Sequence, residues 1–501
     1  MPGNLVAIFY ARHAGFGAKP AIVWNDAPVI DHAGLPATVG RYRAALAALG
    51  VRRGDRVMVK TENSPAFVYT YLAVLASGAI FVPMNAAYTA AEVALLIEDA
   101  EPALLVHAAA TPVPDEAAAP VKRATLEPDG TGSLPDLALS LEPDLTIEPV
   151  AADDLAAILF TSGTTGRPKG AMLSHGNLSS NVAALHEAWR FSPDDSILHA
   201  LPLFHAHGLF VALHLALYNA CTLVMLPKFN AAEVIARLGR VSVFMGVPTY
   251  YARLLADASF DRAACASIRL FVSGSAPLLP SVFDAFAART GHRILERYGM
   301  TEAVMITSNR YEQAGRIAGT VGFPLPGVSL NIVDAERRPL PPGEVGEIEI
   351  RGPNLCAGYW RRPEATAESF HADGFFRTGD TGFKDAEGRV SIVGRSKDLI
   401  ISGGFNVYPA EVEIPLAEVE GVVDVAVFGV PHPDFGEAVV AAVTVDRADF
   451  DVAAQEAAAA ASFARFKQPK AIHVLPELPR NAMGKIMKSE LRKRYADSFT
   501  A

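Results

Sequence analysis

The sequence predicts an α/β protein with a large N-terminal domain of parallel-rich sheets covered by helices, a small β-rich subdomain, and a small C-terminal α+β domain. Strand-like apolar runs alternate with helical patterns over the first two-thirds of the chain, as parallel sheets require. From residue 339 onward, the segment PLPPGEVGEIEIRGPN alternates polar and apolar residues after a Pro/Gly turn, which is typical of antiparallel strands. A polar link at 396–398 then precedes a region with strand patterns of its own.

The elements of the large domain follow in order along the chain. Residues 155–160 are mostly apolar and predict a buried strand. Further strand-like runs, each leading into a loop rich in Gly, Pro, Ser or Thr, lie at 241–247, 270–272 and 293–296. A helix is predicted at about 281–290, because Gly291 follows it as a stop signal. Ligands in open α/β sheets bind beyond the carboxyl ends of the strands, so one cleft could collect these loops.

Domain boundaries are predicted from changes in the pattern of polar and apolar residues along the chain. A chain of 501 residues exceeds the usual size of one domain. We expect an N-terminal domain at 1–395, with its β-rich subdomain at about 325–395, and a C-terminal domain at 396–501. The second is a normal domain in size, about 100 residues, and has strand patterns at 422–430 and 438–445.

Composition argues against several classes of protein. The net charge of −10 disfavours nucleic acid or an anionic membrane as a partner. The three cysteines are scattered without a CxxC pair, so we expect no disulfide framework or zinc site, and a reducing cytoplasm fits. No signal peptide is predicted at the start of the chain. Residues 208–226 are long enough for a membrane span, but His214 and Asn219 interrupt them, which favours a buried helix–strand pair.

The most informative segment is LAAILFTSGTTGRPKGAMLSH at residues 155–175. Its glycines let backbone N–H groups converge, its hydroxyls add donors, and its lysine adds positive charge, which together suit phosphate oxygens. The spacing differs from the common P-loop, which needs four residues between its first Gly and Gly-Lys-Ser/Thr. A solvated surface loop is the alternative. The predicted phosphate-binding residues are Thr161, Ser162, Gly163, Thr164, Thr165, Gly166 and Lys169.

Five more motifs follow, namely SGSAPL (273–278), ERYGMTE (296–302), FRTGD (376–380), GRSKDLIISGGFNVYPAEVE (394–413) and PRNAMGK (479–485). With the loop, they resemble the ordered motifs of the acyl-adenylate-forming enzymes, which include acyl-CoA synthetases, adenylation domains of peptide synthetases, and luciferases. The resemblance spans most of the chain, and six ordered matches make chance implausible. It implies a mobile C-terminal domain and the use of ATP, Mg²⁺ and CoA.

The nucleotide site is predicted partly from chemistry and partly from the resemblance. A carboxylate beside a phosphate loop is costly unless a metal intervenes, so Glu302 indicates Mg²⁺ held with substrate phosphates, the alternative being a surface Glu. Asp380 can accept hydrogen bonds from the two hydroxyls of a ribose. The alternative is that Asp380 only belongs to a turn. The resemblance adds Thr301 and Thr161 at the phosphate and metal, and Arg395 beside Asp380. It assigns the adenine site to Ser275, Ala276, Pro277 and Tyr298.

Four residues of the C-terminal region have roles implied by the resemblance alone. Lys485 would reach from the small domain to the acid and the α-phosphate, where a cation stabilises developing charge. Lys397 occupies the hinge position. Gly403 and Gly404 would enter the cleft in a second domain orientation and flank the pantetheine tunnel, although paired glycines often mark only a turn.

The acyl pocket is predicted from Arg297, which stands where many relatives have Gly. Side chains alternate along a strand, so Glu296 and Arg297 should point apart. An arginine suits a second carboxylate, and ERYGMTE resembles the malonyl-CoA synthetase branch. The following residues, AVMITS, depart from that branch, so methylmalonate or another small dicarboxylate is an alternative substrate. A structural alternative is that Arg297 bonds to backbone or to another acidic side chain. His205 matches an acyl-site position; His207 is a weaker candidate, since a lone histidine is more often structural.

The sequence therefore predicts an ATP-dependent, AMP-forming acid–CoA ligase that converts malonate through malonyl-adenylate. A short-chain or aryl-CoA ligase is the near alternative, but an apolar acid would leave the charge of Arg297 unpaired. A non-catalytic nucleotide-binding or carrier-interaction protein is disfavoured by Lys169, Glu302 and Lys485. Nothing in the sequence favours a luciferase-type oxygenase.

Overall fold

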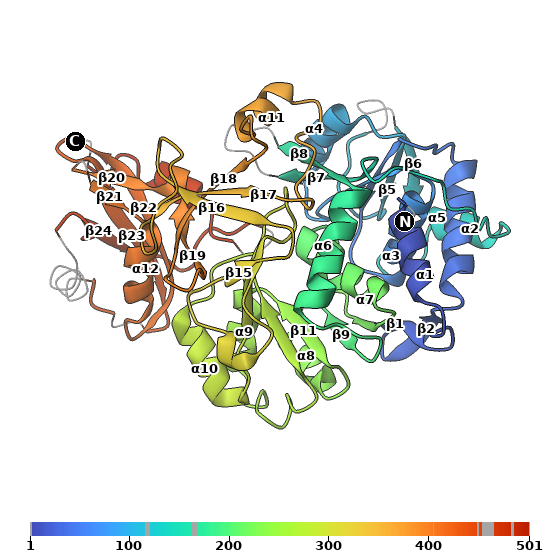
Figure 1. The fold of residues 1–501 in the computed structure, drawn as a ribbon, viewed down its shortest axis with the longest axis horizontal. Helices are drawn as coiled ribbons and strands as arrows, with labels where there is room; N and C mark the ends of the chain where they lie inside the picture. Colours follow the sequence, from blue (N-terminus) through green and yellow to red (C-terminus); the bar gives the residue numbers. More distant parts are fainter. Residues whose placement is uncertain are drawn as a thin grey trace.

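The computed structural model describes residues 3–115, 121–161, 168–403, 405–447, 450–452, 465–481 and 485–499. Two large sheets form the N-terminal part, a small antiparallel sheet follows, and a further sheet belongs to a C-terminal domain (Figure 1). In Figure 1 the small sheet lies between the large sheets and the C-terminal domain at the left. The predicted α/β class, with its parallel-rich sheets and β-rich and C-terminal parts, is confirmed.

The first large sheet has the strand order β15-β14-β13-β12-β11-β9-β10-β1-β2. Its strands are β1 (Pro20–Trp24), β2 (Ala27–Asp31), β9 (Ser196–His199), β10 (Thr222–Met225), β11 (Val243–Gly246), β12 (Leu270–Ser273), β13 (Leu295–Tyr298), β14 (Thr307–Ser308) and β15 (Phe323–Pro324). The central strands pair in parallel, whereas β2, β14 and β15 join antiparallel at the two edges. Its helices are η1 (His207–Leu213), α7 (His214–Tyr218), α8 (Ala231–Leu238), α9 (Pro248–Leu255) and α10 (Pro280–Thr290).

The second large sheet has the order β6-β5-β3-β4-β7-β8 and is parallel except for the β7–β8 pair. Its strands are β3 (Arg56–Lys60), β4 (Ile80–Pro83), β5 (Leu104–His107), β6 (Lys122–Thr125), β7 (Leu155–Thr161) and β8 (Lys169–Ser174). The accompanying helices are α1 (Leu5–Arg12), α2 (Leu35–Ala48), α3 (Pro65–Ala76), α4 (Ala90–Ala100), α5 (Ser133–Leu139) and α6 (His175–Ala188). Helix α3 is buried along nearly its whole length, and a single hydrophobic cluster joins it to residues of both large sheets.

The small sheet is antiparallel and consists of β16 (Ser329–Val333), β17 (Gly346–Arg351), β18 (Phe376–Lys384) and β19 (Val390–Arg395). Short helices near it are η2 (Gln313–Gly315), α11 (Pro363–Ser369) and η3 (Ser396–Asp398). The C-terminal sheet contains β20 (Ile400–Ser402), β21 (Phe405–Val407), β22 (Val422–His432), β23 (Gly436–Val445) and β24 (Ala471–Val474). Helices α12 (Pro409–Ala417) and α14 (Lys488–Arg494) pack on it. The 395/396 boundary stays a prediction.

Several predicted elements are present with small differences. Helix α10 ends at Thr290, and the following Gly291 has a φ of 78°, as the stop signal required. The apolar run at 208–226 forms helices followed by β10, as expected. Strand β13 starts two residues later than predicted, because the N–H of Arg293 bonds to the Gln313 side chain and ladder pairing with β12 begins at Leu295.

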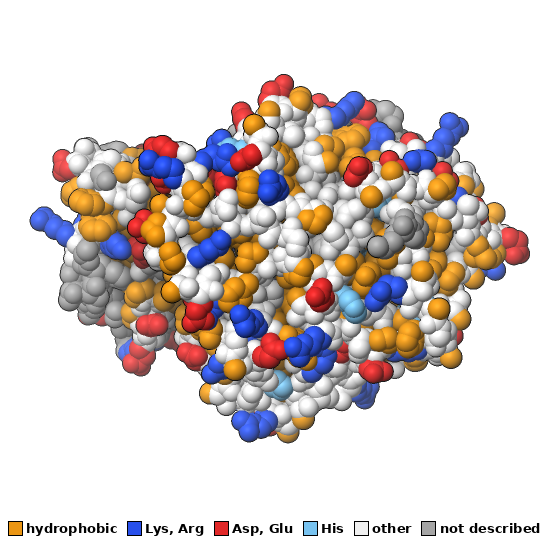
Figure 2. Space-filling view, viewed as in Figure 1, with side chains coloured by type: hydrophobic (Ala, Val, Ile, Leu, Met, Phe, Trp, Pro, Cys, Tyr) orange, Lys and Arg blue, Asp and Glu red, His pale blue; other side chains and the backbone are white. Residues whose placement is uncertain are grey.

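The surface agrees with the charge pattern of the sequence. Figure 2 shows basic and acidic side chains interspersed over the visible face, rather than gathered into one large basic patch. Among the described residues, no helix has both the length and the apolar character that crossing a membrane requires.

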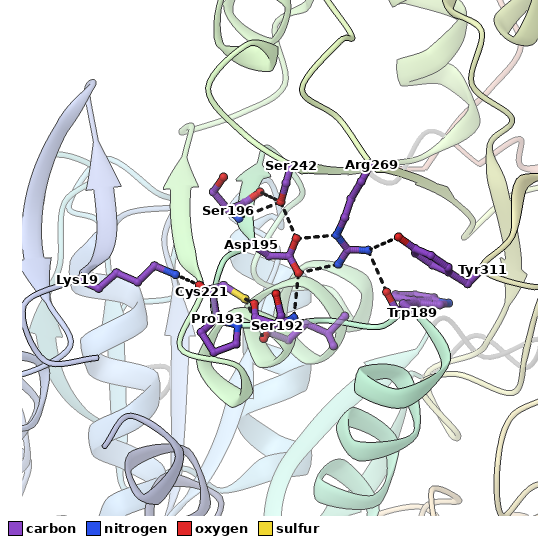
Figure 3. A network of polar contacts seen from close by, with 11 residues as sticks. Lys19, Trp189, Ser192, Pro193, Asp195, Ser196, Cys221, Ser242, Arg269 and Tyr311 are labelled. Atoms are coloured by element: carbon purple, nitrogen blue, oxygen red, sulfur yellow. Dashed lines mark hydrogen bonds and ion pairs between the residues drawn. The ribbon is translucent and has the colours of Figure 1, made fainter. Parts of the chain in front are cut away.

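A closed polar network ties the amino ends of strands in the first large sheet (Figure 3). Asp195 accepts two hydrogen bonds from Arg269, both 2.6 Å long, and one from the Ser242 hydroxyl at 2.7 Å. Arg269 also donates to the Trp189 carbonyl at 3.0 Å and to the Tyr311 hydroxyl at 3.3 Å. Asp195, Ser242 and Arg269 directly precede β9, β11 and β12, so the network lies at the edge opposite the predicted site.

Candidate active site

Two motifs meet where neighbouring strands end. Strands β12 and β13 pair in parallel, so their carboxyl ends at Ser273 and Tyr298 lie side by side. Beyond β12 the chain turns through Gly274 to Ser275, whose φ of 70° is unusual for a residue with a side chain. Backbone strain of this kind clusters at ligand sites, where the surrounding structure enforces it. SGSAPL and ERYGMTE thus share one edge of the sheet.

Asp380 in β18 is held from two sides. The Tyr298 hydroxyl donates to Oδ2 at 2.5 Å, and Arg395 Nε donates to Oδ1 at 2.7 Å. Asp380 and Arg395 face each other in the β18–β19 register, which explains the second contact. Each carboxylate oxygen keeps a further lone pair, so the arrangement fits the predicted ribose role of Asp380. The adenine roles of Ser275, Ala276, Pro277 and Tyr298 remain predictions.

Glu302 is a nearly buried carboxylate with 7 % of its surface exposed. The Tyr359 hydroxyl donates to Oε1 at 2.9 Å, and within the described chain no Lys, Arg or His forms an ion pair with this group. Burial raises the pKa of Glu302, because few nearby charges compensate it. A cation bound at Glu302 would compensate it, so the residue fits a magnesium ligand.

The described part of the chain contains no cluster of three or more His, Cys, Asp or Glu side chains that could hold a metal alone. The expected binding mode for Mg²⁺ needs no such cluster, because one carboxylate acts together with substrate phosphates. Thr301, beside Glu302, and Thr161, at the end of β7, are both partly exposed. The Thr161 hydroxyl donates to the Lys169 carbonyl at 3.3 Å, which leaves oxygen lone pairs for a ligand.

The structure describes the two ends of the predicted phosphate loop. Thr161 closes β7 and Lys169 opens β8, and these two residues are register partners in the antiparallel pair. The Lys169 ammonium lies 5.3 Å from the centre of the Tyr359 ring. The other predicted loop residues, Ser162, Gly163, Thr164, Thr165 and Gly166, lie outside the described residues.

Arg297 is buried with 4 % exposure, and its Nε and Nη2 have no hydrogen-bond partner. Its guanidinium lies against Gly274, since a Cβ built on that glycine would be 2.5 Å from Cζ and Nη1. Burial lowers the pKa of Arg297 to about 9. At neutral pH the group is still charged, so a buried cation with free donors stands at the carboxyl edge of the sheet.

Glu296 does not neutralise this cation. It points away from Arg297, as strand alternation predicts, and its Oε1 accepts from the Leu278 N–H at 3.2 Å. The two side chains form no ion pair, and Glu296 Oε2 is itself without a partner. Burial raises the pKa of Glu296 to about 8, so at neutral pH it is largely a neutral acid.

Two predicted histidines lie near Arg297. His207 begins the π-helix η1, a helix type often found at functional sites, and its Nδ1 is 3.3 Å from the Ser275 hydroxyl. His207 Nε2 is buried without a partner. Burial first, and then Arg297, lowers the pKa values of His207 and of half-buried His205, the latter to about 4. Both imidazoles are therefore neutral at pH 7.

Lys485, from the C-terminal domain, lies near Arg395, Asp380 and His205. Its backbone N–H donates to Asn481 Oδ1 at 3.0 Å, which shapes the turn that carries it. The pKa of Lys485 is lowered, first by the loss of hydration that surrounding protein atoms cause and then by the charge of Arg395. The negative charge of Asp380 acts in the opposite direction. Lys485 also contributes to the low pKa of His205, so its charge lies near both the nucleotide and acyl residues.

Lys397 and Gly403, the described residues among those with predicted hinge and tunnel roles, follow the small sheet in the chain. Lys397 is in η3 between the small sheet and the C-terminal domain, and burial, then Arg395, lowers its pKa. Gly403 is exposed, with φ 58°, and its N–H donates to the Phe435 carbonyl at 2.8 Å. Gly404 lies outside the described residues. The CoA roles of both glycines remain predictions.

Tyr359 was missed by the sequence reasoning. It contacts both Glu302 and Lys169, two residues that were predicted. An aromatic after Gly358 gives no functional signal by itself, because nothing in the local sequence shows which strand the segment joins.

The comparisons with known proteins identify the family. A model described as AMP-binding enzyme matches residues 9–360, and one described as AMP-binding enzyme C-terminal domain matches 411–485. The chain belongs to the AMP-binding enzymes. It is 37% identical to a feruloyl-CoA synthase of Amycolatopsis sp, which covers 97% of this chain and 98% of that protein. Malonate–CoA ligase of Arabidopsis thaliana is 36% identical, with 89% and 78% covered.

Among solved structures, ATP-bound MatB from Rhodopseudomonas palustris is 45% identical over all of both chains, with a TM-score of 0.96. The apo structure of that protein has a TM-score of 0.84, so the overall arrangement here is closer to the ATP-bound form. Together, the comparisons show an AMP-forming acyl-CoA ligase that uses ATP and CoA, while the acids named for its relatives differ.

Proposed function

We propose that the protein is a malonate–CoA ligase that forms malonyl-CoA, AMP and pyrophosphate from malonate, ATP and CoA. The observation that carries this proposal is the buried guanidinium of Arg297, which has two nitrogens without partners. Malonate at neutral pH has two carboxylates. One must face the α-phosphate of ATP, so the other lies in the acyl pocket, where an arginine can receive it.

The energetics favour a charged ligand group at this position. An arginine held in the interior without a counter-charge loses hydration that nothing replaces. A distal carboxylate would accept hydrogen bonds from Nε and Nη2 and return the pKa of Arg297 towards its ordinary value. An apolar or aromatic acid would leave the cation unpaired, which argues against a feruloyl-type substrate despite the similar identity of that relative.

His207 would provide a second contact to the distal carboxylate. When the Ser275 hydroxyl donates to Nδ1, the proton of the neutral ring is on Nε2, the nitrogen without a partner. That N–H then joins the Arg297 donors. His205 would lie near both Arg297 and Lys485 as a neutral polar side chain, because a charged imidazole would be repelled by these two cations.

In the first half-reaction, the proximal carboxylate of malonate attacks the α-phosphate and pyrophosphate leaves. Lys485 would place its ammonium at the carboxylate and α-phosphate oxygens, where charge develops in the transition state. Lys169 would bind the departing phosphates, and Asp380 with Arg395 would fix the ribose. Glu302, with Thr301 and Thr161, would hold Mg²⁺, which when bound neutralises phosphate charge.

In the second half-reaction, the CoA thiolate attacks the acyl carbon and AMP leaves. One site cannot present Lys485 and the pantetheine path in the same geometry, so the C-terminal domain would rotate about Lys397. Gly403 and Gly404 would then come to the cleft, where a glycine permits close approach to the thiol arm. The exposure of Gly403 in the present arrangement is consistent with this exchange of faces.

Acid selectivity tests the proposal directly. Malonate, methylmalonate, propionate and ferulate are compared by kcat/KM for CoA-thioester formation. The proposal requires malonate to be used best; a preference for methylmalonate would keep a dicarboxylate pocket and change the named substrate. Equal or better use of propionate or ferulate would contradict the dicarboxylate assignment and leave an acyl-CoA ligase for another acid.

A further inference from the structure

We propose that Tyr359 is a positioning residue of the ATP site that fixes the Glu302 carboxylate and the Lys169 ammonium relative to each other. The inference rests on the proposed metal role of Glu302. It assigns a function to a side chain that the mechanism above does not use, and it links two parts of the site that come from different segments of the chain.

The backbone explains why Tyr359 reaches both partners. Residues 357–360 run along the free edge of β8: the Ala357 N–H donates to the Met172 carbonyl and the Met172 N–H to the Gly358 carbonyl, both at 2.9 Å. The Trp360 N–H donates to the Gly170 carbonyl at 2.8 Å. This antiparallel bridge places Tyr359 opposite Ala171. Because alternate residues share a face of a strand, Lys169 is the diagonal neighbour of Tyr359.

A second set of contacts brings the same segment to Glu302. The Cys356 N–H donates to the Glu302 carbonyl at 2.7 Å, which anchors the backbone of the carboxylate. The Tyr359 N–H donates to the Thr366 hydroxyl at 2.9 Å, and the tyrosine is 7 % exposed. These bonds anchor the backbone on both sides of Tyr359, and burial leaves the ring little freedom to rotate.

The two ends of the tyrosine side chain then do different work. The phenolic hydroxyl donates to Glu302 Oε1 at 2.9 Å, so it fixes the orientation of the carboxylate. Groups that hydrogen-bond a metal ligand in this way set its orientation and affinity. The ring face lies 5.3 Å from the Lys169 ammonium and attracts it through the negative potential of the π system. One residue thus adjusts a metal-binding group through its hydroxyl and a phosphate-binding group through its ring.

Two substitutions separate these effects. Tyr359→Phe keeps the ring and removes the hydroxyl, whereas Tyr359→Leu removes both. Tyr71→Phe is the matched control, since its buried hydroxyl bonds to His214 at 2.6 Å and its ring packs against Phe81 and Phe210, none of them residues of the ATP site. Thermal unfolding of each variant establishes that it is folded before binding is measured.

Calorimetry of ATP binding, with Mg²⁺ and with EDTA, gives a readout that does not depend on turnover. For Tyr359→Phe, we expect Mg²⁺-dependent tightening of ATP binding to need about tenfold more metal, the lower end of the effect of losing such a partner. Binding of ATP in EDTA should stay within about twofold, because the ring still holds Lys169. Tyr359→Leu should show the same metal shift and, in addition, about two- to fivefold weaker binding in EDTA.

The outcomes distinguish this inference from the metal assignment. Glu302→Gln is titrated in parallel, and its curve must shift if Glu302 binds the metal. A shift in Glu302→Gln together with an unchanged curve in Tyr359→Phe would overturn the role of Tyr359 and leave the metal site intact. Unchanged curves in both variants would remove the metal role of Glu302 and with it the present inference. A shift in Tyr71→Phe of equal size would show a general loss of rigidity instead.

Discussion

Two arginines at strands of the same sheet, the partly buried Arg269 and the buried Arg297, are in opposite situations. Arg269 stands just before β12, at the amino edge, and its hydrogen bonds reach Asp195, Trp189 and Tyr311 (Figure 3). Arg297 stands in β13, near the carboxyl edge, with two nitrogens unpaired. The first belongs to a network that the fold completes by itself. The second has donors that the fold does not satisfy, which is expected where a ligand supplies the missing acceptor.

The pKa values express the same difference. Burial opposes the charge of Arg269, but the hydrogen bonds and charge of Asp195 outweigh it and raise the pKa. Burial lowers the pKa of Arg297 to about 9, because the nearby Tyr251 and Glu296 compensate it only weakly. Burial of a charged side chain therefore indicates a binding site only when the protein supplies no counter-charge and no hydrogen-bond partners for it.

Breaking the closed network should give the largest effect. Arg269→Leu leaves Asp195 buried without its partner, and we expect a loss of about 3–5 kcal/mol in the free energy of unfolding. Guanidinium unfolding followed by tryptophan fluorescence is a suitable measurement, since Trp189 contacts Arg269. The control is Arg190→Leu, whose ion pair with Glu312 is exposed and should contribute below about 1 kcal/mol. Equal effects of the two substitutions would contradict the comparison.

Arg297, whose nitrogens lack partners, should affect kcat/KM for the acid substrate and not the free energy of unfolding. Arg297→Gly would leave the distal carboxylate of malonate unpaired, at a cost of about 2–5 kcal/mol in kcat/KM, or tens to thousands of fold. Propionate, with no second charge, should lose little. The kcat/KM values for both acids in both proteins give the answer. A large loss of stability with unchanged malonate selectivity would make Arg297 a structural residue like Arg269.

Lys485 brings a positive charge from the C-terminal domain close to His205 and Asp380. Lys485→Ala should slow malonyl-adenylate formation by about 100-fold or more, as removal of a transition-state contact does. Thioester formation from supplied malonyl-adenylate should be largely retained, because the C-terminal domain presents a different face in that step. Pyrophosphate exchange and single-turnover thioester assays measure the two steps separately. Equal losses in both would refute this division of roles.

The two edges should also differ in their response to acid. Burial lowers the pKa values of His199 and His205 to about 4, so the folded protein binds their protons less readily than the unfolded chain, whose histidines titrate near 6.5. The contribution of these two histidines to the free energy of unfolding is complete above pH 6.5 and is lost as the pH falls towards 4. Asp195 has a lowered pKa, because Arg269 outweighs burial, so its contribution persists until the pH falls below the ordinary aspartate range.

Stability at pH 7 and pH 5 tests this difference. We expect a loss of up to about 2 kcal/mol for each buried histidine over this interval. His199→Gln should flatten the dependence, whereas Arg269→Leu should lower stability by a similar amount at both values. A dependence unaffected by His199→Gln would show that this histidine is not a neutral buried group.

Much of the fold could be predicted because its signals are local. The apolar run of β7 and the glycine after α10 indicate their elements without reference to the rest of the chain. The opposite orientations of Glu296 and Arg297 follow from strand alternation alone. The unpaired state of Arg297 could not be predicted, because it depends on which groups the surrounding loops bring near it. Tyr359 was missed for the same reason: its place beside Lys169 depends on a strand pairing between distant segments.

The contact between Gly274 and Arg297 makes these two positions depend on each other. A Cβ at position 274 would lie 2.5 Å from Cζ and Nη1 of Arg297, so the two side chains compete for one volume. Any residue larger than glycine at 274 would require the guanidinium to move from its present position. Substitutions at 274 and 297 should therefore not be additive: Gly274→Ala should change acid selectivity in the native protein and have a smaller effect once Arg297 has been replaced by glycine.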